Sequence, residues 1–484
     1  MIRLLVALSL LAVLAGCAVN PATGRNDFVM MSEAQELALG RDAHQQILQQ
    51  YPRYADEALQ AYVQRVGERV ARHSHRGQLD YRFTVIDSPD INAFALPGGY
   101  IYIHRGLLAY LGSEAELGSE AELAAVLGHE VGHVTARHGV RQQSQSTAWG
   151  ILGQAVAMGT GVGAAADVTG ALGTAFVRGY GRDMELEADG LGAQYLARGG
   201  YDPQAMIEVV KVLKLQEDFA RDQAARRGEQ QPAGGYHGLF DTHPDNDRRL
   251  QQVLGPARAL VNGQQEVNRD AFLQRLQNLP FGDSAESGIR RGERFYHRDL
   301  DFALTFPRGW SIINQPQTLI GHSADEQVFV AMTLEDNPRK LDAATLLRQR
   351  IGGNRLREEA PLQQAGLQGH MGVIDGSAPR RVAAILKGGK AYLFVGAVKG
   401  RAVQAQDDAQ FIAAIKSFRP LQAAERTLAE PLRLQLVRVK AGQTVKALAA
   451  KSGLSGDAEG SLRLLNNLYP QGEPRPGEWF KTVR

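Results

Sequence analysis

Residues 129–133 read His-Glu-Val-Gly-His, and this pentapeptide decides which fold and which chemistry the rest of the chain is expected to build. Successive residues of an α-helix turn by about 100°, so His129 and His133 point the same way, roughly 6 Å apart along the axis. Two imidazoles on one face can share a metal ion, and Glu130 can take a proton from metal-bound water without binding the ion. The pattern indicates a zinc-dependent hydrolase. The alternative is an ordinary core helix with two hydrogen-bonded histidines.

The residues that precede the pentapeptide favour a metal site. A helix is predicted over residues 114–127, in which apolar Leu123 and Leu127 can bury one face while the opposite face presents the ligands. Gly128 and Gly132 each cost about 1 kcal/mol in helix propensity. They also let neighbouring backbone approach closely, and we expect such an approach at the metal site.

A catalytic zinc site needs a third protein ligand and an open position for water. The segment Met184–Gly190 reads Met-Glu-Leu-Glu-Ala-Asp-Gly and is predicted to be helical, with Glu185 and Asp189 one turn apart. We expect Glu185 to complete the zinc shell and Asp189 to accept the second ring N–H of a ligand histidine. Glu187 lies on another face and is the weaker candidate. An acidic helix is usually solvated surface, so its weight comes from following the metal motif.

Taken together, these motifs resemble the HtpX-like and CAAX-prenyl-protease-like zinc metallopeptidases, whose hallmark is a His-Glu-x-x-His helix followed by Glu-x-x-x-Asp. The resemblance covers about residues 25–255, and Asn20–Arg25 looks like the start of the bacterial periplasmic lipoprotein branch. It implies a mainly helical zincin-type (gluzincin) peptidase domain with a small edge-strand sheet, which we place at residues 17–265. It also implies one Zn²⁺ per chain, held by the two histidines and Glu185.

A predicted hairpin upstream of the metal motif resembles a further signature of this family. Pro97-Gly98-Gly99 forms its turn, and Tyr100–Ile103 alternate as a strand should. In the family this is an edge strand beside the zinc helix, which implies that Gly99, Tyr100 and Ile101 bind the main chain of an extended peptide. A plain hairpin with no role in binding is the alternative.

A His-Pro pair with an arginine six positions after the histidine is the third part of the resemblance, and here it is His243-Pro244 with Arg249. The resemblance implies that His243 approaches the zinc from a loop. There it would either stabilise the oxyanion or bind the zinc and occupy the position of the water. Arg249 would anchor that loop or the substrate backbone.

The N-terminal residues have the organisation of a bacterial lipoprotein signal peptide, which we place at residues 1–16. The apolar run from Leu4 to Leu14 is too short for a normal transmembrane span, and Leu-Ala-Gly-Cys17 forms a lipobox. Cys17 is the only cysteine, which excludes an intramolecular disulfide and disfavours a thiolate metal site. We expect a lipid anchor at Cys17 and, because Ala18 rather than aspartate follows, an outer-membrane lipoprotein facing the periplasm. A cysteine buried as a small hydrophobe is the alternative.

Two further segments flank the metal-binding helices. Gly112–Leu117 (Gly-Ser-Glu-Ala-Glu-Leu) is repeated without change at Gly118–Leu123. We expect the second copy to lead into the metal helix and the first to alter the preceding loop. Residues 147–177 carry one charge, Asp167, among many glycines and alanines. We interpret them as a helical hairpin over the active-site cleft, with a membrane-surface contact as the alternative.

The pattern after Arg291 changes to the short strands and helices of a small α+β domain, which we place at residues 290–422. Strands are predicted over Asp301–Trp310, Gln327–Leu334 and Ala391–Val398, and helices over Leu341–Ile351 and Gln410–Phe418. The Phe-Pro-x-Gly-Trp opening resembles PsbP/Mog1-like domains, and binding or structural support is the expected role. Residues 430–484 resemble a LysM-like βααβ module, which implies binding to peptidoglycan. A docking domain without glycan affinity is the alternative.

The composition is compatible with a multidomain protein, because 44% apolar residues can form several cores, and a net charge of +2 provides no footprint for nucleic acid. The sequence therefore predicts a multidomain α+β zinc metalloendopeptidase that acts on polypeptides in the periplasm. By resemblance alone, its substrates are misfolded or misassembled envelope proteins. Two alternatives stay open. One is a non-catalytic chaperone or assembly factor whose site is closed by His243, and the other is a peptidoglycan-binding envelope protein.

Overall fold

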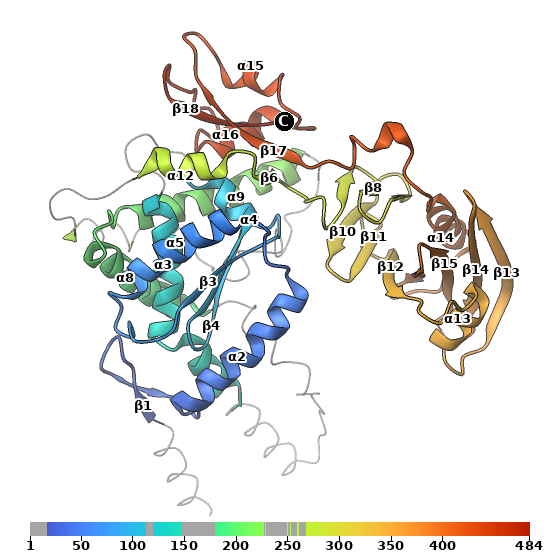
Figure 1. Cartoon of the computed structure of the whole chain (residues 1–484), viewed down its shortest axis with the longest axis horizontal. Helices are drawn as coiled ribbons and strands as arrows, with labels where there is room; N and C mark the ends of the chain where they lie inside the picture. Colours follow the sequence, from blue (N-terminus) through green and yellow to red (C-terminus); the bar gives the residue numbers. More distant parts are fainter. Residues whose placement is uncertain are drawn as a thin grey trace, which may run out of the picture. The chain divides into compact units, whose positions relative to one another are not determined.

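The computed structural model describes residues 17–112, 120–147, 180–226, 228, 249, 252, 259–260, 268–376 and 378–484. These residues form two compact units. One combines Arg433–Arg484 with the described residues up to Phe281, and the other is Gly282–Leu432 (Figure 1). Residues 1–16, most of the first copy of the six-residue repeat, the predicted hairpin beyond Thr147 and His243 lie outside the described residues. The predictions made for them stay predictions.

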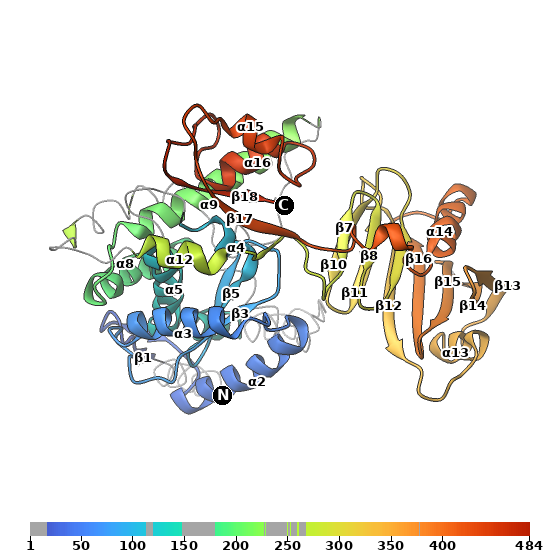
Figure 2. The same ribbon diagram turned by 45° about the horizontal axis from the view of Figure 1, so that its top comes forward.

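The helices of the first unit surround the metal-motif helix. They are α2 (Glu33–Gln50), α3 (Glu57–Ala71), α4 (Arg105–Tyr110), α5 (Glu120–Thr135), α8 (Arg182–Arg198), α9 (Ala205–Arg226) and α12 (Arg269–Leu276). Local chemistry sets their starts: Ser32 and Gln35 form a capping box at α2, and Asp56 accepts the Leu59 N–H at α3. The helix α5 begins in the second copy of the repeat and is buried along its length, because α3, α8 and α9 pack around it (Figure 2).

A three-stranded sheet lies beside α5 in the order β3 (Arg82–Ile86), β5 (Tyr100–His104), β4 (Ala93–Leu96). Phe94 and Tyr102 pack against Ile47 of α2, while α3 and α5 contact the sheet from the other side (Figure 1). The strand β5 pairs parallel with β3 and antiparallel with β4. The prediction that Tyr100–Ile103 form an edge strand is therefore wrong, because both sides of β5 are already hydrogen-bonded. Within the described residues, β4 is paired on one side only and is the edge next to α5.

The C-terminal residues have the expected βααβ order, in β17 (Leu432–Arg438), α15 (Val445–Ala449), α16 (Ala458–Leu465) and β18 (Trp479–Val483). They are joined to the first unit, because β17 lies between β18 and β6 (Pro280–Phe281) in one three-stranded sheet. Buried Lys481 donates hydrogen bonds of 2.8 Å to the carbonyl oxygens of Ala109 and Leu111 at the end of α4. The helix α16 also packs against α4 and α9. The C-terminal residues thus complete the first unit instead of standing apart as a module.

The second unit is the predicted small α+β domain. Its strands are β7 (Ile289–Arg291), β8 (Arg294–His297), β9 (Phe302–Thr305), β10 (Ser311–Gln315), β11 (Thr318–His322), β12 (Val328–Asp336), β13 (Leu356–Gln364), β14 (Leu367–Ile374), β15 (Arg380–Lys387) and β16 (Lys390–Val398), and its helices are α13 (Ala343–Arg350) and α14 (Ala405–Ser417). An antiparallel sheet has the order β10-β11-β12-β16-β15-β14-β13, and β7-β8-β9 form another. Alternate residues of β15 face opposite ways: Ala383 and Ile385 join the α14 core, and Val382 and Ala384 pack against α13. Helices therefore cover both faces of the large sheet.

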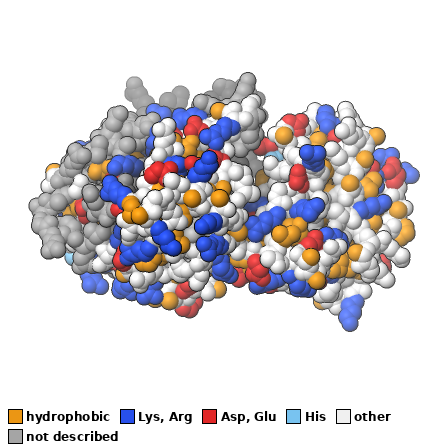
Figure 3. Space-filling model, turned by 90° about the horizontal axis from the view of Figure 1, so that it is seen from above, with side chains coloured by type: hydrophobic (Ala, Val, Ile, Leu, Met, Phe, Trp, Pro, Cys, Tyr) orange, Lys and Arg blue, Asp and Glu red, His pale blue; other side chains and the backbone are white. Residues whose placement is uncertain are grey.

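Two further properties of the described residues concern their apolar helices and their surface charge. None of their helices is both long and apolar enough to cross a membrane. On the face drawn in Figure 3, acidic and basic side chains are interspersed on both units. The described part of that face therefore shows no extended field of one sign.

Candidate metal centre

Glycines bring the backbones of α5 and α8 into direct contact, as the sequence predicts. A Cβ atom added to Gly132 would lie 2.8 Å from the carbonyl oxygen of Ala188, and one added to Gly192 would lie 3.1 Å from the amide nitrogen of His129. Both distances are shorter than ordinary contacts, so neither position accepts a larger residue without movement of a helix. This close approach places Glu185 of α8 beside the two histidines of α5.

Three side chains converge at this contact and can hold a metal ion: His129, His133 and Glu185. The Nε2 atoms of the two histidines are 2.9 Å apart, and each lies 3.4 Å from a carboxylate oxygen of Glu185. Ligand atoms placed about 2.0–2.1 Å from a tetrahedral zinc ion are separated from one another by roughly 3.3–3.4 Å. The donor set of two imidazoles and a carboxylate fits zinc, and all three residues are buried. The two distances to Glu185 match the tetrahedral spacing, whereas the imidazole nitrogens, at 2.9 Å, must move apart by about 0.4 Å to share the ion.

Asp189 accepts a hydrogen bond from the other ring nitrogen of His129, Nδ1, at 2.8 Å, as predicted. Arg249 donates to both oxygens of Asp189, at 2.8 and 2.7 Å, and its Nη1 lies 3.6 Å from Glu185. The sequence predicts that Arg249 anchors a loop or the substrate; the structure places it on the carboxylates behind the metal ligands. Burial alone would raise the pKa of Asp189, but the Arg249 guanidinium holds that pKa well below its usual range.

The same carboxylates act on the ligand histidine. Burial lowers the pKa of His129, yet Asp189 and Glu185 outweigh it and raise that pKa to about 9. A metal ion must therefore displace a proton from this ring, as is usual for histidine ligands.

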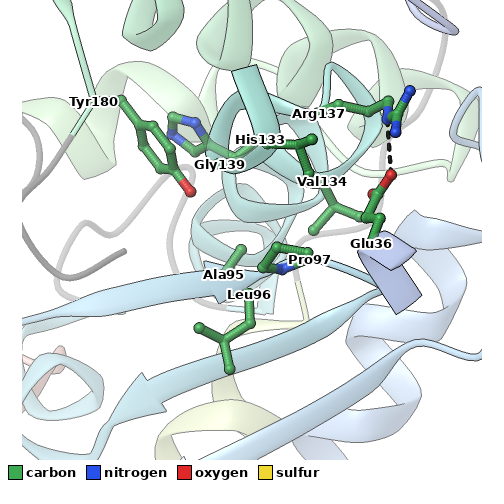
Figure 4. Close-up of a pocket in the computed structure, with 10 residues that line it drawn as sticks. Glu36, Ala95, Leu96, Pro97, His133, Val134, Arg137, Gly139 and Tyr180 are labelled. Carbon is green, nitrogen blue, oxygen red and sulfur yellow. Dashed lines mark hydrogen bonds and ion pairs between the residues drawn. The ribbon is translucent and has the colours of Figure 1, made fainter. Parts of the chain in front are cut away.

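Glu130 is buried beside His129 and lies at the wall of a cavity. The other residues lining this cavity are mostly apolar: Ala93, Leu107, Val126, His129, Met206, Val209, Val210, Leu213 and Arg249. A second cavity lies against His133 and is lined by Glu36, Ala95, Leu96, Pro97, Val134, Arg137, Gly139, Val140 and Tyr180 (Figure 4). The edge strand β4 contributes to both cavities, so they flank the metal ligands along one strand.

The sequence motifs do not identify two residues near the centre, Tyr180 and His138. They indicate Glu187 only as a weaker candidate for the metal. The Tyr180 ring stacks on His133 with 4.0 Å between centroids (Figure 4). Burial raises the pKa of its hydroxyl well above the usual range, and nearby Glu130 and Glu185 add to this. No spacing rule indicates Tyr180, whereas His138 follows His133 by five residues and is visible as an extra histidine.

The residues predicted to bind substrate lie away from an open edge. Gly99 has φ 95° in the turn between β4 and β5, where the left-handed region favours glycine. The main chains of Tyr100 and Ile101 are paired with β3 and β4. These three residues therefore shape the hairpin, and β4 is the strand of this hairpin that lies at an edge of the described sheet.

Comparisons with known proteins relate most of the first unit to metallopeptidases. Residues 57–257 match the model described as peptidase family M48. The beta-barrel assembly-enhancing protease of Escherichia coli (strain K12) is 29% identical over 278 residues, which cover 56% of this chain and 53% of that protein. The protein of that name in Yersinia pestis is 31% identical with the same coverage. Mitochondrial metalloendopeptidase OMA1 of Schizosaccharomyces pombe is 29% identical over 244 residues, 48% of this chain and 64% of that protein.

This chain thus spans about half the length of the beta-barrel assembly-enhancing proteases it matches. The solution structure of cyanobacterial PsbP from Synechocystis sp. PCC 6803 matches at 11% identity and a TM-score of 0.22, covering 28% of this chain and 95% of that one. A likeness at this TM-score carries no argument, so the PsbP/Mog1-like assignment stays a prediction, as does the LysM-like one.

Proposed function

We propose that this chain, whose residues 57–257 match peptidase family M48, is a zinc metalloendopeptidase of the bacterial cell envelope. The observation that carries the proposal is the convergence of His129, His133 and Glu185 with Glu130 beside them. A buried carboxylate next to a metal-binding face is the arrangement that hydrolysis by activated water requires.

Each residue of the centre has a separate task in this proposal. Zinc, when bound, supplies a Lewis acid that polarises the scissile carbonyl and acidifies the attacking water. Glu130 takes the proton from that water and passes it to the leaving amine. Asp189, held by Arg249, keeps the Nε2 lone pair of His129 directed at the metal. His243 has the two candidate roles that the resemblance implies, oxyanion stabilisation or closure of the water position.

The edge strand β4 and the two cavities support a polypeptide substrate. No described strand pairs with the outer side of β4, and an extended peptide can add there by main-chain hydrogen bonds, which select for an extended chain and not for a sequence. Ala93, near one end of β4, lines the apolar cavity with Glu130, and Leu96 at the other end lines the cavity with His133. We therefore expect cleavage next to an apolar residue. The bacterial relatives are named for enhancing beta-barrel assembly, and we propose misfolded or misassembled envelope proteins as the substrates of this chain.

The N-terminal sequence supports a location at the membrane surface. A lipid anchor at Cys17 would hold the protein on the outer membrane, facing the periplasm. The alternative of a closed, non-catalytic assembly factor depends on His243. Peptidoglycan binding by residues 430–484 is supported only by the βααβ order of their elements.

Zinc content and cleavage of an unfolded polypeptide such as casein test the proposal with the full chain. Glu130→Gln is expected to keep its zinc and to lose about 10²–10⁴-fold in cleavage rate, the usual share of a general base. Glu68→Gln, on the exposed face of α3, is the matched control and should cleave normally. Zinc binding without any Glu130-dependent cleavage would reject the enzyme and favour the assembly factor.

A further inference from the structure

The two ligand histidines are supported in different ways. The Nδ1–H of His129 meets a carboxylate directly, at Asp189. The Nδ1 atom of His133 lies instead 2.8 Å from Nδ1 of His138, and Nε2 of His138 lies 3.1 Å from Oε2 of Glu187. His138 is fully buried, so this second histidine stands between the metal ligand and its carboxylate.

The direction of the hydrogen bonds in the series His133–His138–Glu187 follows from its two ends, the metal site and the carboxylate. His133 turns Nε2 towards His129 and Glu185, so a ring that binds metal there carries its proton on Nδ1. His138 must then accept at Nδ1 and carry its own proton on Nε2, from which it donates to Glu187. Each donor meets one acceptor, and a single pair of histidine tautomers satisfies both hydrogen bonds.

An unusual backbone conformation makes the contact between the two histidines. In a continuous helix, residues five apart point about 140° away from one another, so His133 and His138 would not meet. The helix α5 ends at Thr135, and Arg137 adopts φ 54°, in the left-handed region. Such a conformation costs on the order of 1–3 kcal/mol in a non-glycine residue. It is held by hydrogen bonds from Arg137 to buried Glu36, at 2.7 Å, and to the carbonyl oxygen of Met31.

Other side chains hold Glu187, the last residue of this hydrogen-bonded series, in place. Arg141 donates to its Oε2 at 3.0 Å, and Asn20 donates to its Oε1 at 3.2 Å. Asn20 is itself buried and also donates to Asp27, so the hairpin of β1 (Cys17–Val19) and β2 (Asn26–Phe28) holds the carboxylate. The left-handed turn at Arg137 thus brings His138 against His133, and Arg141 and Asn20 hold the carboxylate that His138 contacts.

We propose that His138 and Glu187 are positioning residues that hold the metal ligand His133 in the correct tautomer and orientation. His138 contacts Nδ1 of His133 with one ring nitrogen and the carboxylate of Glu187 with the other, so it links the ligand to that carboxylate. The proposal rests on metal binding by His129, His133 and Glu185, which is part of the proposed function.

A pair of nearly isosteric substitutions tests this role in the full chain. His138→Asn keeps an acceptor, the side-chain oxygen, near the position of Nδ1, whereas His138→Leu removes it. We expect the dissociation constant for zinc, measured by chelator competition, to rise by about 10–100-fold in His138→Leu, as for other supports of ligand histidines. His138→Asn should restore only part of the affinity, because its amide reaches His133 but has no atom at the position of Nε2, which contacts Glu187. The cobalt-substituted proteins should show an altered ligand-field spectrum only for the leucine variant.

A second variant keeps the test informative if His138→Leu does not fold. Glu187→Gln should weaken zinc binding, while Asp183→Asn, an exposed carboxylate-to-amide change on the same helix, should leave it unchanged. Wild-type affinity in His138→Leu, equal affinities in the two His138 variants, or wild-type affinity in Glu187→Gln would overturn the proposal. If the wild-type chain itself bound no zinc, the metal centre of the proposed function would fail first.

Discussion

Replacing Gly132 with alanine tests how the metal centre depends on the contact between α5 and α8. The added Cβ would lie 2.8 Å from the oxygen of Ala188 and 3.0 Å from its Cα, whereas ordinary contact begins at 3.4 Å. Both neighbours are backbone atoms, so α8 must move away by about 0.6 Å, and overpacking of this kind costs about 1–3 kcal/mol. Glu185 moves with α8, and metal sites tolerate displacements of only about 0.5 Å. We expect weaker zinc binding, by tenfold or more.

Gly190→Ala is the matched control, because Gly190 also lies in α8 and a Cβ there meets nothing within 4 Å. Both substitutions gain about 1 kcal/mol of helix propensity, so the difference between the variants isolates the packing cost. Chemical unfolding in excess chelator should show Gly132→Ala less stable than Gly190→Ala by about 1–3 kcal/mol. Equal stabilities and wild-type zinc affinity in Gly132→Ala would refute the reasoning.

Three further changes probe the supports of the centre. Asp189→Asn leaves the Arg249 guanidinium buried beside a neutral amide, and urea unfolding of the metal-free protein should show a loss of about 3–5 kcal/mol; a loss below about 1 kcal/mol would contradict the buried pair. Burial lowers the pKa of Lys481 to about 7. Between about pH 7 and 10 the unfolded chain therefore binds more protons than the folded one, and the stability of the wild type should rise with pH relative to Lys481→Met. Thermal unfolding of both proteins across this range measures the stability difference, and a difference independent of pH would argue against a buried amine. Deleting residues 433–484 should leave a protease-sensitive fragment that binds zinc poorly, and a stable zinc-binding fragment would show that these residues are dispensable.

The local part of the metal centre is predictable from the sequence because helical geometry fixes it. The i and i+4 spacing of His129 and His133 sets their common face, and the same spacing in α8 separates Glu185 from Asp189. The close approach at the glycines is likewise predictable, because a glycine in a helix next to ligands has few other uses. These features depend on one turn of helix each.

Features that depend on tertiary pairing escape the sequence. The strand that begins at Tyr100 has the alternation of an edge strand, but its parallel partner β3 lies earlier in the chain and carries no signal of pairing. The support of His133 by His138 requires a left-handed arginine at position 137, which no helix pattern predicts. The proposed role of Glu187 cannot be predicted for the same reason, because its partner His138 is placed by that turn.

The attachment of Lys481 to the end of α4 has a consequence for when the first unit becomes complete. The hydrogen bond to Ala109 joins residues 372 positions apart in the chain, with the whole second unit between them. Contacts of such long sequence separation form late, because a large loop must close before they contribute. During synthesis or export, a partly emerged chain would already contain the metal motif but would lack the strands that finish its unit. The proposed proteolytic activity would therefore be delayed until residues 433–484 have emerged and paired with β6.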